Sequence, residues 1–172
     1  MKILITGSER GLGKRIYENL CHDYKISEFD FTLLHEYDVL INNCIRKYDQ
    51  LDLLQTVFDS WKDREKTIIN IGSRSKYSNI SKGFTYSAKK SALSHMASNM
   101  RFLSDKTCRI MDLNPGMLNS ENIPSLSYQE VIDALRWMLK VPKHIEVGEL
   151  NFWYNMPYDK ISKMKDELKN DE

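Results

Sequence analysis

A tyrosine and a lysine four residues apart could form an acid–base pair in this sequence. Tyr86 and Lys90 lie within residues 84–104, where an apolar stripe predicts a helix. In a helix, residues i and i+4 lie one above the other on the same face. A phenol ionises near pH ~10, so it carries protons poorly at neutral pH unless a fixed cation stabilises the phenolate. Lys90 would be that cation. Spacing alone favours a simpler interpretation, a solvated lysine beside a partly buried ring, so the surrounding elements must decide.

A serine hydroxyl thirteen positions upstream of the tyrosine is the third candidate group. Ser73 ends the apolar run 67–73, which predicts a buried strand. Open α/β sheets bind ligands beyond the carboxyl ends of their strands. A later apolar strand, 108–113, ends in Asn114, Pro115 and Gly116, which stop the strand and turn the chain over the same edge. We therefore expect Ser73 to lie where a ligand binds.

A glycine-rich turn follows the first predicted strand, 2–6. Gly7, Gly11 and Gly13 join this strand to an amphipathic helix. Without a Cβ the turn can be tight, a diphosphate can approach the backbone, and the helix N-terminus presents free N–H groups to the anion. Any tight turn between a strand and a helix favours glycine, but three glycines at this spacing favour nucleotide binding.

The type of nucleotide stays open at this level. A carboxylate roughly 20 residues beyond the turn, at Glu28 or Asp30, would bind an adenosine ribose. A solvated loop acid explains either residue equally well. Arg10, beside the glycines, would meet a 2′-phosphate or would be a surface arginine. NAD and NADP are both compatible with this pattern.

Strands and helices alternate along the chain, which predicts a parallel sheet with helices on both faces. The helix 128–140 begins with a capping box at Ser127 and Glu130. We expect one domain over residues 1–158 and a charged tail, 159–172, that forms a short helix or frays. The remaining predicted elements are strands at 24–31, 38–43 and 146–154 and a helix at 47–64.

Composition excludes several classes of function. Lys plus Arg number 25 against 24 for Asp plus Glu, a net charge of +1, so nothing indicates a nucleic-acid partner. No apolar run approaches the ~18 residues of a membrane span, and no leader is expected. The three cysteines are odd in number and share no close spacing, which predicts reduced thiols in a cytoplasmic protein. The histidines lie far apart in the sequence, so no metal site is expected.

Taken in order, the motifs resemble those of the short-chain dehydrogenase/reductase family. The resemblance covers about residues 2–155 and implies a Rossmann-like doubly wound sheet that binds NAD or NADP. The three residues between Gly7 and Gly11 give a glycine spacing that is similar to that of the family's reductase subgroup. The matching features are the turn from Thr6 to Gly13, Asn42-Asn43 after a strand, Ser73, Tyr86-x-x-x-Lys90, and Pro115-Gly116 followed by Ser120.

The resemblance implies an oxidoreductase that interconverts a carbonyl and an alcohol on a small molecule. Tyr86 would exchange a proton with the substrate oxygen, Ser73 would hydrogen-bond that oxygen, and Lys90 would stabilise the phenolate and hold the nicotinamide ribose. The implied cofactor contacts are Gly7, Ser8, Arg10, Gly11, Leu12, Gly13, Asp30, Asn42, Asn43, Cys44, Lys90, Pro115, Gly116 and Ser120.

The departures from the family pattern are concentrated on the cofactor side. Only 28 residues separate Gly13 from Asn42, so we expect the sheet to lack a strand and at least one helix there. Cys44-Ile45 stands where the family has Ala-Gly. No asparagine is placed to join the proton relay, and Arg46, Asp49 or Asp52 would lie in its neighbourhood. The alternative function is therefore a catalytically weak or inactive nucleotide-binding or regulatory protein. A homodimer through the helices at 47–64 and 84–104 is compatible with both functions.

Overall fold

The computed structural model describes residues 1–43, 49–77 and 83–170. The strands are Lys2–Ile5 (β1), Lys25–Glu28 (β2), Val39–Asn42 (β3), Thr67–Ile71 (β4), Arg109–Pro115 (β5) and Glu149–Phe152 (β6). The α-helices are Gly11–Leu20 (α1), Gln50–Trp61 (α2), Phe84–Arg101 (α3), Tyr128–Lys140 (α4) and Tyr158–Asn170 (α5), and two 3₁₀ turns span Phe31–Leu33 (η1) and Arg74–Lys76 (η2).

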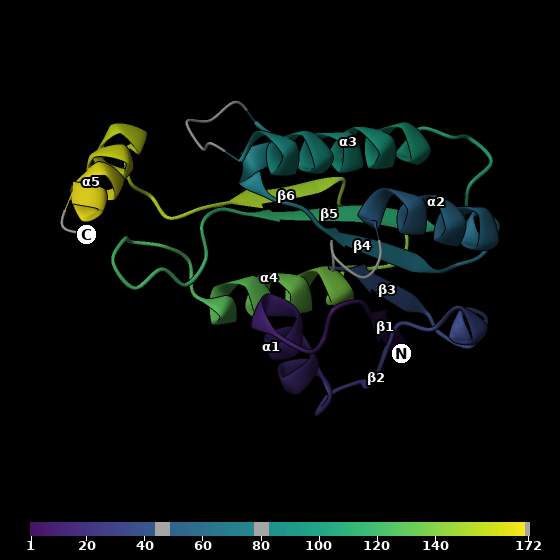
Figure 1. Cartoon of the computed structure of the whole chain (residues 1–172). Coiled ribbons are helices and arrows are strands. Elements are labelled where there is room, and N and C mark those ends of the chain that lie inside the picture. Colours follow the sequence, from purple (N-terminus) through teal and green to yellow (C-terminus); the bar gives the residue numbers. More distant parts are fainter. Residues whose placement is uncertain (44–48, 78–82, 171–172) are drawn as a thin grey trace.

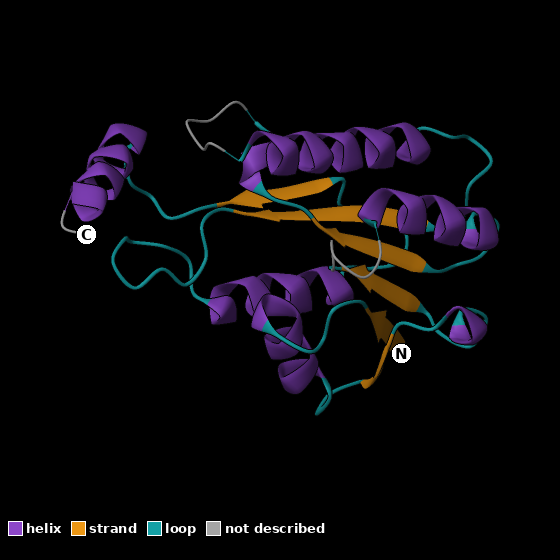
Figure 2. Ribbon diagram, in the orientation of Figure 1, coloured by secondary structure: helices purple, strands orange, loops and turns teal. Residues whose placement is uncertain are grey.

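The strands form one sheet in the order β2-β1-β3-β4-β5-β6, and every neighbouring pair is parallel. Helices α2 and α3 cover one face and α1 and α4 cover the other (Figure 1). Figure 2 shows the same layers by secondary structure, with α5 standing beyond the end of β6. The prediction of a parallel α/β sheet with helices on both faces is confirmed.

Alternate residues of each strand enter two separate cores. Ile5 and Ile41 pack with Leu135 of α4 on one face of the sheet. Leu40 and Ile68 pack with α2 and α3 on the other face. Because successive strand side chains point to opposite faces, strands buried on both sides are apolar almost throughout. A row of buried polar residues, described below, interrupts the α2/α3 face.

The chain is short between β2 and β3. In this segment the described residues form only η1 and a turn, with no α-helix, so β2 is the outermost strand of the sheet. The backbone O atom of Leu34 accepts from Trp61 Nε1 at 3.2 Å and from Lys66 Nζ at 2.8 Å, which fastens the short connection to the body. The expected loss of a strand and a helix between Gly13 and Asn42 is confirmed.

Several element boundaries differ from the predicted ones. The strand predicted at 24–31 spans only Lys25–Glu28, because its partner β1 has four residues and Asp30 then caps η1. Helix α3 ends at Arg101, and the next residue, Phe102, is 86% exposed and does not join the core. The predicted capping box of α4 is present in full. None of the described helices has both the length and the apolar content that crossing a membrane requires.

Candidate functional site

The glycine turn brings β1 and α1 into close contact. Gly7 and Gly11 have positive φ values of 73° and 54°, a region that side chains with a Cβ rarely occupy. A Cβ on Gly13 would lie 1.9 Å from the backbone oxygen of Gly7. The amide of Asn43 donates to the backbone O atom of Thr6 at 3.1 Å and so ties the end of β3 to the same turn. Glycine is therefore required here by the backbone itself.

The first turn of α1 presents free backbone donors at this edge. Its N-cap residue, Arg10, is exposed and makes no side-chain capping bond, and Leu12 packs partly against the core. Among the described residues, no acceptor binds the N–H groups of Gly11 and Gly13. Unpaired N–H groups at a helix N-terminus form an anion site. The N-terminus of α1 is therefore the place where the diphosphate is predicted to bind.

Glu28 reaches the beginning of the same turn from the carboxyl end of β2. Its carboxylate accepts from the N–H of Gly7 at 3.0 Å, from the N–H of Ser8 at 3.2 Å, and from the Ser8 hydroxyl. The structure thus brings Glu28, rather than Asp30, to the glycine turn. Asp30 is exposed and accepts from the N–H of Thr32 at 2.8 Å, and this bond lowers the pKa of its carboxyl group.

Ser73 follows β4 directly and begins η2. Its Oγ accepts from the N–H of Ser75 at 3.1 Å and from the Ser75 hydroxyl at 2.9 Å. A hydroxyl has two acceptor positions and one donor. No acceptor among the described residues takes the Ser73 O–H, so this donor is available to a ligand.

Tyr86 and Lys90 lie on one face of α3, as their spacing predicts. The Lys90 Nζ atom is 5.6 Å from the centre of the Tyr86 ring. The tyrosine is 41% exposed, whereas the lysine is only 4% exposed. The phenol therefore faces solvent at the sheet edge, with a buried ammonium beneath it.

The ammonium of Lys90 is held by the ends of two other elements. Its Nζ donates to Gln50 Oε1 at 2.7 Å and to the backbone O atom of Ile71 at 2.6 Å. Burial lowers the pKa of Lys90 to about 8, and the charge of Asp112 opposes part of this shift. Two of the three N–H donors are thereby used, so one remains for a ligand or for the tyrosine.

Gln50 is a site residue that the sequence analysis missed. It is 5% exposed, and its Nε2 donates to the backbone O atom of Asn42 at 2.6 Å while its own backbone O atom accepts from Asn42 Nδ2 at 3.0 Å. A signal was available, because Gln50 is a polar residue in the apolar stripe that continues with Leu53, Leu54 and Val57. Of the residues expected in this neighbourhood, Asp49 caps α2 and pairs with Lys89. Asp52 is exposed on α2, and Arg46 lies outside the described residues.

A row of polar side chains crosses the α2/α3 face of the sheet from this point. Asn42 donates to Asn70 at 3.0 Å, and Asn70 donates to Asp112 at 2.9 Å. Asp112 is 1% exposed and pairs with Arg101 at 3.3 Å. Burial raises the pKa of Asp112, which the bonds from Asn70 and Arg101 oppose. The row gives the buried ammonium of Lys90 a distant counter-charge.

The remaining predicted cofactor contacts follow β5. Pro115 ends the strand, and the N–H of Gly116 donates to the backbone O atom of Phe152 at 2.8 Å, at the end of β6. The N–H of Ser120 binds the Ser125 hydroxyl at 2.8 Å within the following loop. These residues lie at the carboxyl edge of the sheet, at and beyond the end of β5, which is the neighbour of β4. Cys44, the last predicted contact, lies outside the described residues.

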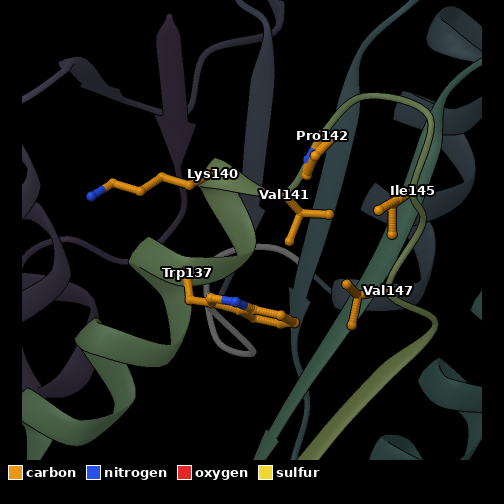
Figure 3. Close-up of a pocket in the computed structure, with 6 residues that line it drawn as sticks. All are labelled: Trp137, Lys140, Val141, Pro142, Ile145 and Val147. Atoms are coloured by element: carbon orange, nitrogen blue, oxygen red, sulfur yellow. The ribbon is translucent and has the colours of Figure 1, made fainter.

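An apolar hollow of about 210 Å³ lies at the opposite edge of the sheet (Figure 3). It is formed by the end of α4 and the segment leading into β6, so it belongs to the amino ends of the strands. None of the predicted site residues lines it. Its lining residues are Trp137, Lys140, Val141, Pro142, Ile145 and Val147. Over the part of the chain that is described, no three His, Cys, Asp or Glu side chains cluster as metal ligands would.

Comparison with known proteins identifies the fold. No protein-family model matches the sequence, and no curated protein matches it. Serine dehydrogenase from Escherichia coli aligns over 89% of this chain and 97% of its own, with 18% identity and a TM-score of 0.69. An alcohol dehydrogenase from the archaeon Thermococcus sibiricus, complexed with 5-hydroxy-NADP, aligns over 91% of this chain and 98% of its own, with 18% identity and a TM-score of 0.69.

A short chain dehydrogenase family protein from Francisella tularensis aligns over 87% of this chain and 95% of its own, with 15% identity and a TM-score of 0.62. At these identities the comparison concerns the fold. Together with the strand order, the glycine turn and the short β2–β3 connection, it shows that the chain has the fold of the short-chain dehydrogenases in a shortened, six-stranded form.

Proposed function

We propose that this protein is an NAD(P)-dependent oxidoreductase that interconverts a carbonyl and an alcohol on a small molecule. The observation that carries the proposal is the position of the Lys90 ammonium. It lies beneath the exposed ring of Tyr86 and binds the backbone O atom of Ile71, two residues before Ser73. A phenol, a hydroxyl and a buried cation are thus associated with one strand end, at the edge where parallel α/β sheets bind ligands.

The residues of the glycine turn fit a dinucleotide. The N–H groups of Gly11 and Gly13, which no described residue accepts from, would bind its diphosphate, and we expect the Glu28 carboxylate to meet a ribose hydroxyl. Glu28 contacts only the start of the turn, so it leaves the helix N-terminus open. When bound, the nicotinamide would supply or accept a hydride. Because a carboxylate repels a 2′-phosphate, we expect NAD to bind more tightly than NADP.

The protein's own residues would position the substrate and move one proton. Tyr86 would donate its phenolic proton to the substrate oxygen in reduction and accept it back in oxidation. The free O–H of Ser73 would donate to the same oxygen and fix its position. Lys90, with a pKa of about 8, is mainly protonated at neutral pH and would stabilise the phenolate form.

The test combines ligand binding with one matched pair of variants. Isothermal titration of the purified chain should show binding of NAD(H), and a panel of small alcohols and carbonyls should show turnover. Tyr86→Phe should lower kcat by at least about a hundredfold, the contribution of a general acid–base group, while leaving the cofactor Kd within about twofold. Tyr24→Phe, which changes a partly buried tyrosine just before β2, should retain wild-type turnover. Failure of both cofactors to bind at millimolar concentration would refute the proposal.

The second candidate is a nucleotide-binding protein without catalytic activity. The observation that favours it is the short connection between β2 and β3, which leaves β2 as an edge strand. Fewer protein residues would then contact a bound adenosine. The same experiments separate the two functions. Tight cofactor binding by wild type, with no turnover of any compound in the panel, would favour this candidate.

A further inference from the structure

The residue directly after Ser73 carries a guanidinium that is fixed in place. The Arg74 guanidinium carbon lies 4.1 Å from the centre of the Trp153 ring. Trp153 follows β6, and a Cβ on Gly116 would lie 2.6 Å from the Cβ of Trp153, so the backbone that carries this tryptophan packs closely against the end of β5. Stacking on an aromatic face uses the flat side of a guanidinium and leaves its N–H edge free.

The turn that carries Arg74 is itself held firmly. The Lys76 side chain, 5% exposed, pairs with Glu149 of β6 at 2.7 Å and donates to the Ser94 hydroxyl of α3 at 2.9 Å. The Ser91 hydroxyl, also on α3, donates to the backbone O atom of Lys76 at 2.6 Å. Helix α3 and strand β6 therefore fix η2 from both sides, and the position of Arg74 with it.

Three cations near Arg74 are paired with carboxylates, whereas Arg74 has no such pair among the described residues. Lys76 pairs with Glu149, Lys89 with Asp49 at 3.0 Å, and Arg101 with Asp112 at 3.3 Å. Among residues 1–43, 49–77 and 83–170, no carboxylate pairs with Arg74. Trp153 is 44% exposed, so the stacked pair is accessible from solvent.

We propose that Arg74, stacked on Trp153, binds a carboxylate of the substrate, so that the protein acts on hydroxy acids or oxo acids. This inference rests on the proposed function and specifies its substrate class. A guanidinium binds a carboxylate through two parallel hydrogen bonds. Because the contact with Trp153 already restricts the Arg74 side chain, binding an anion costs less conformational entropy. Because Ser73 caps the turn η2 that begins with Arg74, we expect the anion to bind at the same strand end as the Ser73 hydroxyl.

The test measures preference between an acid and its uncharged ester. Wild type, saturated with NAD, is assayed with 2- and 3-hydroxybutyrate and with their methyl esters. We expect kcat/KM for the better acid to exceed that of its ester by about tenfold or more, the scale of one charge-assisted hydrogen-bond pair. Arg74→Gln should remove most of this ratio through a higher KM for the acid, and Arg74→Lys should retain part of it. Lys143→Gln is the control, because that exposed lysine lies at the other edge of the sheet.

A binding measurement separates this inference from the proposed function. Each acid is titrated into the full chain while tryptophan fluorescence is followed, since Trp153 contacts the proposed site. Saturable changes with the acid but not the ester, lost in Arg74→Gln, support the anion site even if no compound is turned over, in which case only the proposed function fails. Equal turnover of acid and ester, or no Arg74-dependent binding of either acid, overturns the inference.

Discussion

The buried ammonium of Lys90 should make the protein more stable as the pH rises above neutrality. Its pKa is lowered from 10.5 to about 8 because burial disfavours the charged form. At ~1.36 kcal/mol per pH unit, keeping this group charged in the folded chain costs about 3 kcal/mol at pH 7. Between pH 8 and 10.5 the unfolded chain binds more protons than the folded chain, so the free energy of unfolding increases with pH through that window.

Replacing the lysine by a neutral side chain of similar length isolates this contribution. Lys90→Met removes the charging cost, but Gln50 Oε1 loses its donor, and the backbone O atom of Ile71 loses one of two donors and keeps Gln50 Nε2 at 3.2 Å. Each lost partner costs about 1–3 kcal/mol, so the net change at pH 7 can have either sign. The change with pH does not share this ambiguity. From pH 7 to pH 10, wild type should gain about 2–3 kcal/mol relative to the variant.

Urea unfolding at pH 7, 8, 9 and 10, fitted with a common m-value, measures this difference. Contributions from other titrating groups are shared by both proteins and cancel in the comparison. Lys89→Met is the matched control, because the Lys89 side chain is 54% exposed. The free energy of unfolding of this variant should change with pH as that of wild type does. If the difference between wild type and Lys90→Met stays constant across this range, the ammonium is not buried as described. The proposed role of Lys90 beneath Tyr86 would then lose its basis.

Two further predictions concern the elements that build the site. Gly13→Ala should destabilise the fold by about 2 kcal/mol or more, because its Cβ would meet the backbone oxygen of Gly7 at 1.9 Å, whereas Gly11→Ala has open space and should lose only about 1 kcal/mol from its positive φ. Thermal unfolding of the two variants checks this order, and equal losses would contradict it. Ser127→Ala removes the cap of α4 and should lose about 1 kcal/mol in urea unfolding, while a loss below about 0.3 kcal/mol would show that Glu130 and solvent replace it.

Features that depend on neighbouring residues were predictable from the sequence. The glycine turn, the capping box of α4 and the i,i+4 placement of Tyr86 and Lys90 are set by local backbone geometry, and each is present. The alternation of strands and helices along the chain likewise predicted the parallel sheet. The short spacing between Gly13 and Asn42 predicted the missing elements, because a crossover helix requires a minimum number of residues.

Contacts between distant segments were not predictable in the same way. Gln50 and Lys90 are 40 residues apart, and no local pattern states that their side chains meet. The choice between Glu28 and Asp30 depended on where β2 ends, which is set by the length of its partner β1 rather than by its own residues. Arg74 and Trp153 come together only because β6 lies beside β5.

The sequence by itself determined which residue types are available for proton transfer and nucleotide binding, and which of them lie one helical turn apart. Periodicity and backbone preference act over a few residues, so these features need no knowledge of the rest of the chain. The tertiary structure decided which ammonium is buried, which carboxylate meets the glycine turn and which guanidinium lies over Trp153. Burial and charge pairing arise from packing between segments, so they exist only once the sheet and its helices have assembled.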